Sequence, residues 1–166
     1  MKNTFLKLFL PFFFLVFLWS CEKEESRVYL EGGTPPVLTS SVTGTVPLSF
    51  VNKDQEAIRL SWTNPAYQFT TGTSSQNVTY QVEIDTTGSN FTNPNRKIIT
   101  VSNDLGLTLT QDQLNDYLLN QLQLNTTMSH NIEMRVRSTL GTSAAPFFPP
   151  SPLVERAGVR QNSFNS

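Results

Sequence analysis

The sequence predicts an all-β sandwich with one short helix, carried behind a secretion signal. Three segments alternate apolar and polar residues with a period of two: residues 57–62, 78–84 and 132–137. That period is typical of strands with one buried face and one wet face. Three such strands imply two sheets packed against each other. A single later segment, over residues 110–122, has helical spacing instead.

The first twenty residues have the layout of a signal peptide. Lys2 and Lys7 precede an apolar run without charge, from Leu8 to Trp19, as in segments that direct secretion. A transmembrane helix needs about 20 apolar residues, and this run is shorter. We therefore expect residues 1–20 to be removed from the mature chain.

The sole cysteine of the chain, Cys21, follows that run directly, behind the small residue Ser20. The order Leu18, Trp19, Ser20, Cys21 resembles a bacterial lipobox, in which the cysteine sulfur takes a diacylglyceryl group. Acyl chains contribute about 0.8 kcal/mol per buried methylene, so two or three chains hold a protein on a membrane. The alternative is an unmodified thiol behind an ordinary cleavage site.

An acidic tether is expected over residues 21–35. Glu22, Lys23, Glu24 and Glu25 form a charged tetrad that must lie in water. It resembles the signal that sends Bacteroidetes lipoproteins to the cell surface, and the alternative is an ordinary solvated linker.

Loss of Lys2 and Lys7 moves the net charge from −1 to −3. Nucleic-acid binding needs a concentrated basic surface, so we expect no nucleic-acid partner.

The remaining elements follow in order within a predicted sandwich over residues 36–150. Residues 31–49 are rich in Gly and Pro and predict an extended linker or an edge strand. Weaker strands are expected over residues 97–101 and 105–109, after a turn over residues 86–95. Thr110 and Gln113 have the spacing of a capping box before the helix. Prolines dominate residues 146–152, and we expect a disordered tail over residues 151–166.

Two aromatic residues are predicted to fill the core. Trp62 alternates with Ile58 and Leu60, and Tyr80 alternates with Val78 and Val82, so both rings point between the sheets. Large aromatic side chains bury about 150 to 250 Å² each. This layout resembles that of immunoglobulin-like and fibronectin type III domains.

A narrower resemblance rests on four segments in order. These are Trp62-Thr63-Asn64-Pro65-Ala66-Tyr67, Val78 to Asp85, Gln113 to Leu122, and Arg135-Val136-Arg137. Together with the lipobox and the acidic tether, they are similar to the amino-terminal domain of SusE-type outer-membrane lipoproteins, over roughly residues 21–141. The family has a final strand after Gly141, where this chain has Pro149, Pro150 and Pro152. We therefore expect a truncated or frame-altered remnant from about Phe148 onward.

The resemblance implies an outer-membrane, lipid-anchored protein on the cell surface. Its partners would be membrane lipid through Cys21, a glycan transporter complex and a polysaccharide of the starch type. In that family sugar binding resides chiefly in further domains, and this sequence runs to Ser166. We therefore expect a spacer and docking module. The alternatives are a direct glycan-binding module and a truncated, non-functional fragment.

No enzymatic chemistry, cofactor or metal site is expected. His130 is the sole histidine, so a nucleophile, histidine and acid triad would have to form around it. We interpret it as a loop residue. Asp54 with Glu56, or Asp112 with Asp116, would hold calcium only loosely. Glu83 and Asp85 are the most tempting pair for glycoside cleavage, but we expect both on a solvated strand face.

Three aromatic residues in loops are the candidates for contact with a glycan. Tyr67, Phe69 and Phe91 have Asn64, Gln68 and Asn90 nearby in the sequence, so that rings could stack on a sugar while amides bind its hydroxyls. The competing interpretation, which we favour, is that Tyr67 and Phe69 cover the edge of the core and Phe91 fills a loop.

Overall fold

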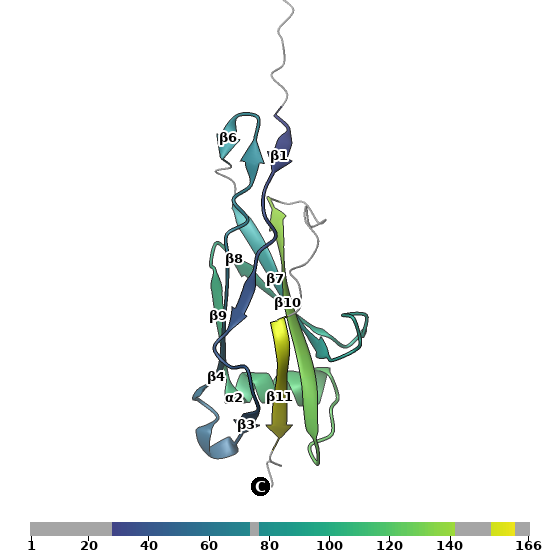
Figure 1. Ribbon diagram of the computed structural model, residues 1–166. Helices are drawn as coiled ribbons and strands as arrows, with labels where there is room; N and C mark the ends of the chain where they lie inside the picture. The colour runs from purple at the N-terminus through teal and green to yellow at the C-terminus, as the bar shows by residue number, and fades with distance from the viewer. Residues whose placement is uncertain (1–27, 74–76, 142–153, 162–166) are drawn as a thin grey trace, which may run out of the picture.

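The computed structural model describes residues 28–73 and 77–141, and the backbone of residues 154–161 (Figure 1). It is an all-β sandwich with one short helix, as predicted. The strands are β1 (Leu30–Gly32), β2 (Leu38–Ser40), β3 (Val46–Leu48), β4 (Glu56–Trp62), β5 (Gln68–Phe69), β6 (Gly72–Thr73), β7 (Val78–Thr86), β8 (Lys97–Ser102), β9 (Gly106–Thr110), β10 (Ser129–Leu140) and β11 (Val154–Gln161).

Two sheets form the sandwich. One has the order β2-β4-β9 and the other the order β3-β11-β10-β7-β8. Both are antiparallel except where β11 runs parallel to β3. A third, small sheet of β1-β5-β6 extends one end of the molecule, and β11 ends at the opposite end (Figure 1).

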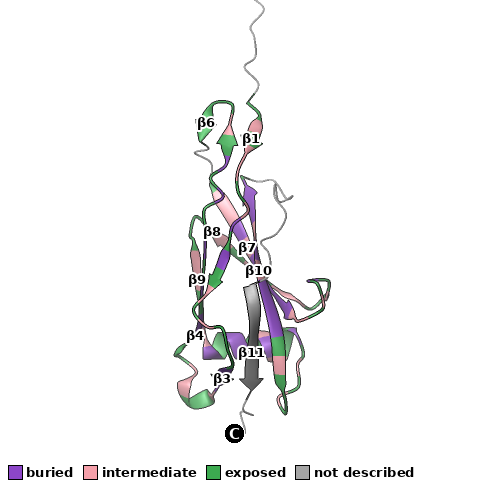
Figure 2. Cartoon of the chain, in the orientation of Figure 1, coloured by how far each residue is buried: buried purple, intermediate pink, exposed green. Residues whose placement is uncertain are grey.

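The core lies between the two large sheets, where the buried residues gather (Figure 2). The rings of Trp62 on β4 and Tyr80 on β7 lie there, with centroids 5.4 Å apart and planes tilted by 51°. Tilted pairs at this distance are favourable beyond the area that they bury. The apolar residues of the three expected strands complete this core: Ala57, Ile58, Leu60, Val82, Ile84, Ile132, Met134 and Val136.

The strand predictions are confirmed at β4, β7 and β10, and the weaker ones at β8 and β9. These strands could be predicted because each has one buried face. Its residues therefore alternate between apolar and polar within a short stretch of the chain. The turn between β7 and β8 is also present. Its Gly88, Asn90 and Phe91 have positive φ, which glycine and asparagine adopt most easily.

The short helix is α2 (Gln111–Asp116), continued by one π-helical turn, η3 (Tyr117–Gln121). The predicted capping box is present, because Thr110 Oγ1 accepts from the Gln113 amide and Gln113 Oε1 accepts from the Thr110 amide. Leu114, Leu118 and Leu122 point into the core. The helix therefore closes the end of the sandwich at which β11 ends (Figure 1).

Thr110→Ala is expected to lower the free energy of unfolding by about 1 kcal/mol, because it removes the side-chain acceptor of the capping box. Urea unfolding followed by circular dichroism measures the change. Thr108→Ala is the matched control, since Thr108 is exposed on β9 and outside the cap. It should lower the free energy of unfolding by less than Thr110→Ala does. Equal losses in the two variants would contradict a role for the cap.

Residues 28–48 are more structured than an extended linker. β1 pairs with β5, although residues 21–35 were expected to be tether. β2 pairs with β4, and Leu38, Val46 and Leu48 are buried in the core. Pro47 lies in the edge strand β3, where a missing N–H is tolerated. Of the two alternatives for residues 31–49, the edge strand is therefore the one that the structure shows, because β1, β2 and β3 each stand at the edge of a sheet.

The expectation of a disordered tail over residues 151–166 is corrected only over residues 154–161, which form β11; residues 151–153 and 162–166 lie outside the described residues. This strand lies between β3 and β10 in the five-stranded sheet. The last proline of the tail, Pro152, comes before its first residue. Strand pairing on both sides supplies backbone hydrogen bonds whatever the side-chain pattern, so the missing period of two did not exclude a strand.

Candidate functional site

The expected lipid-attachment residue, Cys21, lies outside the described residues, as do the predicted signal peptide and the first part of the predicted tether. The described chain begins at Val28, just before β1. β1 belongs to the small sheet at one end of the molecule (Figure 1). Among the described residues, no helix has the length and apolar character needed to cross a bilayer.

Tyr67 lies against the core and not on an open surface. Its phenol oxygen is 2.8 Å from Ser138 Oγ and also donates to the Ser138 carbonyl at 3.3 Å. Burial raises the pKa of Tyr67 above its ordinary value, more than the hydrogen bond with Ser138 lowers it. Phe69, on β5, is half-buried and paired with Leu30 of β1. The Tyr67 ring is therefore covered, and Phe69 is covered in part.

Phe91 is also buried, in the loop between β7 and β8. The Arg135 guanidinium lies 4.1 Å above the centre of its ring, as in a cation–π contact. The structure therefore does not bring Phe91 together with Phe69, which lies in the small sheet. Glycan contact by Tyr67, Phe69 and Phe91 stays a prediction, and it would require covered rings to become exposed.

Glu83 is buried, which corrects the expectation that Glu83 and Asp85 lie on a solvated face. Its side chain is 2% exposed, although it points away from the core between the sheets. Arg96 Nε donates to Oε1 at 3.1 Å, and Arg135 Nε donates to Oε2. Arg137 Nε lies 3.2 Å from the same Oε2. Three guanidinium groups and the loop before β8 thus cover this acid.

The charge of Glu83 is stabilised by these arginines. Burial alone would raise the pKa of its carboxyl group, but hydrogen bonds from Arg135 and Arg96 and the charges of Arg135 and Arg137 outweigh that effect. The pKa of Glu83 is consequently below its ordinary value. A carboxylate held ionised in this way has no proton to give to a leaving group, so the geometry does not support a role as general acid.

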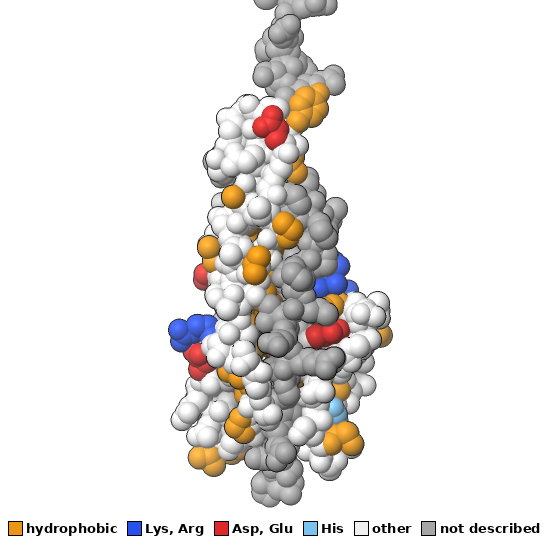
Figure 3. Space-filling view, viewed as in Figure 1, with side chains coloured by type: hydrophobic (Ala, Val, Ile, Leu, Met, Phe, Trp, Pro, Cys, Tyr) orange, Lys and Arg blue, Asp and Glu red, His pale blue; other side chains and the backbone are white. Residues whose placement is uncertain are grey.

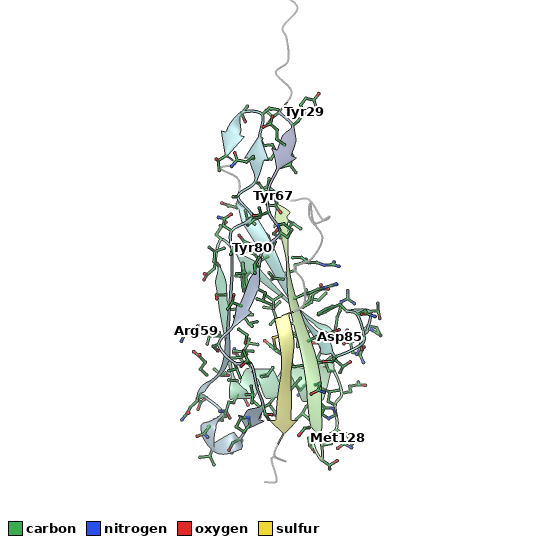
Figure 4. All side chains as sticks on the ribbon, viewed as in Figure 1. Tyr29, Arg59, Tyr67, Tyr80, Asp85 and Met128 are labelled. Carbon is green, nitrogen blue, oxygen red and sulfur yellow. The ribbon has the colours of Figure 1, made fainter. Side chains whose placement is uncertain are left out.

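Asp85 and Glu133 continue the same charged row. They are partners in the register of β7 and β10, and both are buried. Asp85 accepts hydrogen bonds from the amides of Thr86 and Asn93, whereas Glu133 Oε1 has no hydrogen-bond partner among the residues that the structure describes. Figure 4 places Asp85 on the side of the sandwich opposite Arg59, which lies on β4.

The remaining candidates have structural surroundings. His130 was interpreted as a loop residue, but it is the second residue of β10, and its Nε2 is 2.6 Å from the Asn125 carbonyl oxygen. Asp112 lies in the first turn of α2, where a negative charge complements the helix dipole. Over residues 28–73 and 77–141, no three His, Cys, Asp or Glu side chains gather closely enough to hold a metal ion.

The comparison with known families adds one finding. The model of the family described as SusE outer membrane protein matches residues 23–137. The chain belongs to the SusE family. Membership places the protein at the outer membrane and on the cell surface, among surface binding and accessory proteins. No curated protein matches the sequence.

The arginine cluster around Glu83 falls within the part that matches the SusE family. The sequence did not reveal it, because Arg135 lies 52 residues from Glu83 and meets it only through the register of β7 and β10. The available signal was the alternation of charged residues along β10. Glu133, Arg135 and Arg137 lie opposite Asp85, Glu83 and Gln81, respectively. That pattern becomes informative only once the strands are known to pair.

Proposed function

We propose that this SusE-family protein is anchored to the outer membrane through an acylated Cys21 and serves as an accessory component of a polysaccharide uptake complex. In that complex the sandwich acts as a spacer and docking module. The observation that carries the proposal is the family match over residues 23–137, which begins two residues after the only cysteine of the chain.

The shape of the domain supports the role of a spacer. β1 lies at one end of the elongated sandwich, and β11 ends at the other (Figure 1). Between Cys21 and Val28 the chain can reach at most about 25 Å. An acylated Cys21 would therefore hold the β1-β5-β6 end near the membrane and present the end closed by α2 away from it.

Cys21→Ala is expected to abolish incorporation of labelled palmitate, because the alanine offers no sulfur for acylation. Metabolic labelling followed by immunoprecipitation measures this. Ser20→Ala is the matched control: it keeps a small residue before the cysteine and should leave labelling intact. Labelled Cys21→Ala protein, or unlabelled wild-type protein, would contradict the lipid anchor.

The accessory role is tested by crosslinking on intact cells, followed by isolation of the tagged full-length protein and mass spectrometry. We expect an outer-membrane transporter and its glycan-binding lipoprotein among the crosslinked proteins, and staining of intact cells by antibody. Cys21→Ala protein, released from the membrane, should lose both. A wild-type protein that stains cells but crosslinks to no transporter would contradict docking while leaving the anchor in place.

A further inference from the structure

The outer face of the five-stranded sheet carries an unusual group of donors. Arg137 on β10 is paired in register with Gln81 on β7, which is paired with Thr100 on β8. Arg135 lies one step along β10 on the same face, opposite Glu83. We call Gln81, Thr100, Arg135 and Arg137 the arginine surface.

Around Glu83, guanidinium groups outnumber carboxylates, although the three arginines of the whole face are balanced by three acids. Arg96, Arg135 and Arg137 all approach the single carboxylate of Glu83. The other acids of the face, Asp85 and Glu133, lie on the side of Glu83 away from Arg137. Across β7 and β8, Arg137 faces the uncharged Gln81 and Thr100.

Donors for a ligand remain available chiefly on Arg137, since the Arg135 side chain is 13% exposed and its guanidinium group lies over Phe91. Arg135 and Arg137 approach Glu83 through Nε, and no hydrogen bond in the described part of the chain uses their terminal Nη atoms. Arg137 Nε is buried and lacks a hydrogen bond within residues 28–73 and 77–141, although Oε2 of Glu83 is near. The Arg137 side chain is 29% exposed, so its outer end reaches solvent. Basic side chains come to the surface at the right of Figure 3, beside acidic ones.

We propose that the arginine surface binds the anionic substituent, a carboxylate or a sulfate, of an acidic saccharide. A guanidinium group matches both oxyanions with paired N–H donors. Gln81 and Thr100 lie beside Arg137 with side chains that can hydrogen-bond sugar hydroxyls. The assignment to a saccharide rests on the proposed role in polysaccharide uptake, whereas recognition of the anion follows from the arginines alone.

Calorimetric titration of the detergent-purified, full-length protein tests the proposal with four probes. These are trigalacturonic acid, a sulfated heparin disaccharide, neutral maltotriose and inorganic sulfate. We expect at least one acidic saccharide to bind at least tenfold more tightly than maltotriose, with an affinity that falls as salt is added. The acidic probe that binds distinguishes carboxylate from sulfate. If neither acidic saccharide binds, or if maltotriose binds as tightly as they do, the proposal is overturned. If inorganic sulfate binds as tightly as the acidic saccharide, the assignment to a saccharide is overturned.

Arg137→Gln should weaken binding of the acidic saccharide at least tenfold. Arg59→Gln is the matched control, because Arg59 is exposed on β4 of the other sheet and pairs with Glu56; its affinity should equal that of the wild type. If Arg137→Gln does not fold, Arg137→Lys is used in its place. Lysine keeps the charge but lacks the planar guanidinium group with its paired N–H donors, so binding should still weaken severalfold. Unchanged affinity in the folded variant would overturn the site. Palmitate labelling and transporter crosslinking should be unaffected by Arg137→Gln, so the proposed function is tested separately.

Discussion

Glu83→Gln is expected to lower the free energy of unfolding by about 3 kcal/mol at pH 7. The substitution keeps the shape of the side chain but leaves three guanidinium groups without their shared countercharge. Breaking a buried ion pair costs about 3 to 5 kcal/mol. The lower end applies here because the arginine side chains are 13–29% exposed and stay partly solvated. Urea unfolding of the two proteins measures the difference.

Glu56→Gln is the matched control for that experiment. Glu56 also accepts from an arginine, with 2.6 Å between Oε2 and Arg59 Nη2, but both side chains are exposed. Exposed pairs contribute about 0 to 1 kcal/mol. Equal losses for Glu56→Gln and Glu83→Gln would show that burial of the cluster does not matter.

The stability difference between the wild type and Glu83→Gln should depend on pH. The pKa of Glu83 is lowered in the folded state, so its contribution is fully present above the unfolded value of about 4.5 and declines as the pH falls through the folded pKa. Unfolding curves measured from pH 7 downward should converge in the acid range. A difference that grows on acidification would contradict the arrangement described.

Tyr80→Ala is expected to lower the free energy of unfolding by about 4 kcal/mol, as do other truncations of large aromatic side chains in cores. Tyr80 is 1% exposed and packs against Trp62 between the two sheets. Its phenol is buried deeply enough to raise the pKa to about 12, with a smaller contribution from Tyr67. Chemical unfolding followed by tryptophan fluorescence measures the loss.

Tyr29→Ala provides the comparison, because it makes the same chemical change at a residue that is 58% exposed at the β1 end of the molecule. Surface substitutions of this kind usually change stability by less than about 0.5 kcal/mol. Comparable losses at Tyr29 and Tyr80 would mean that the packing between the sheets does not dominate the stability.

The elements predicted correctly are those whose signals are local. Trp62 and Tyr80 belong to segments in which alternation alone selects the buried face. The capping box joins Thr110 and Gln113, three residues apart, so no other part of the chain was needed to recognise it. Over residues 31–49 the expected alternative of an edge strand is confirmed, whereas β11 was not predicted because residues 154–161 lack a period of two.

The candidate site was predicted less well, for a different reason. Glu83 alternates with buried residues of β7 and was therefore assigned to solvent. Its burial depends on Arg135 and Arg137 from β10 and on Arg96 from the loop before β8. Phe91 was expected to fill a loop, and it is buried there, but its contact with Arg135 could not be predicted. Alternation tells which face of a strand a side chain occupies, but not what covers that face.

The sequence by itself determined the class of fold, the main strands, the capped helix and the resemblance to SusE proteins, because each can be recognised from short segments of the chain and their order. The tertiary structure decided the place of β11 between β3 and β10 and the burial of Glu83 beneath three arginines. Both depend on which distant strands pair and in what register. That choice is made by the free energy of the whole fold, since each strand alone has several possible partners.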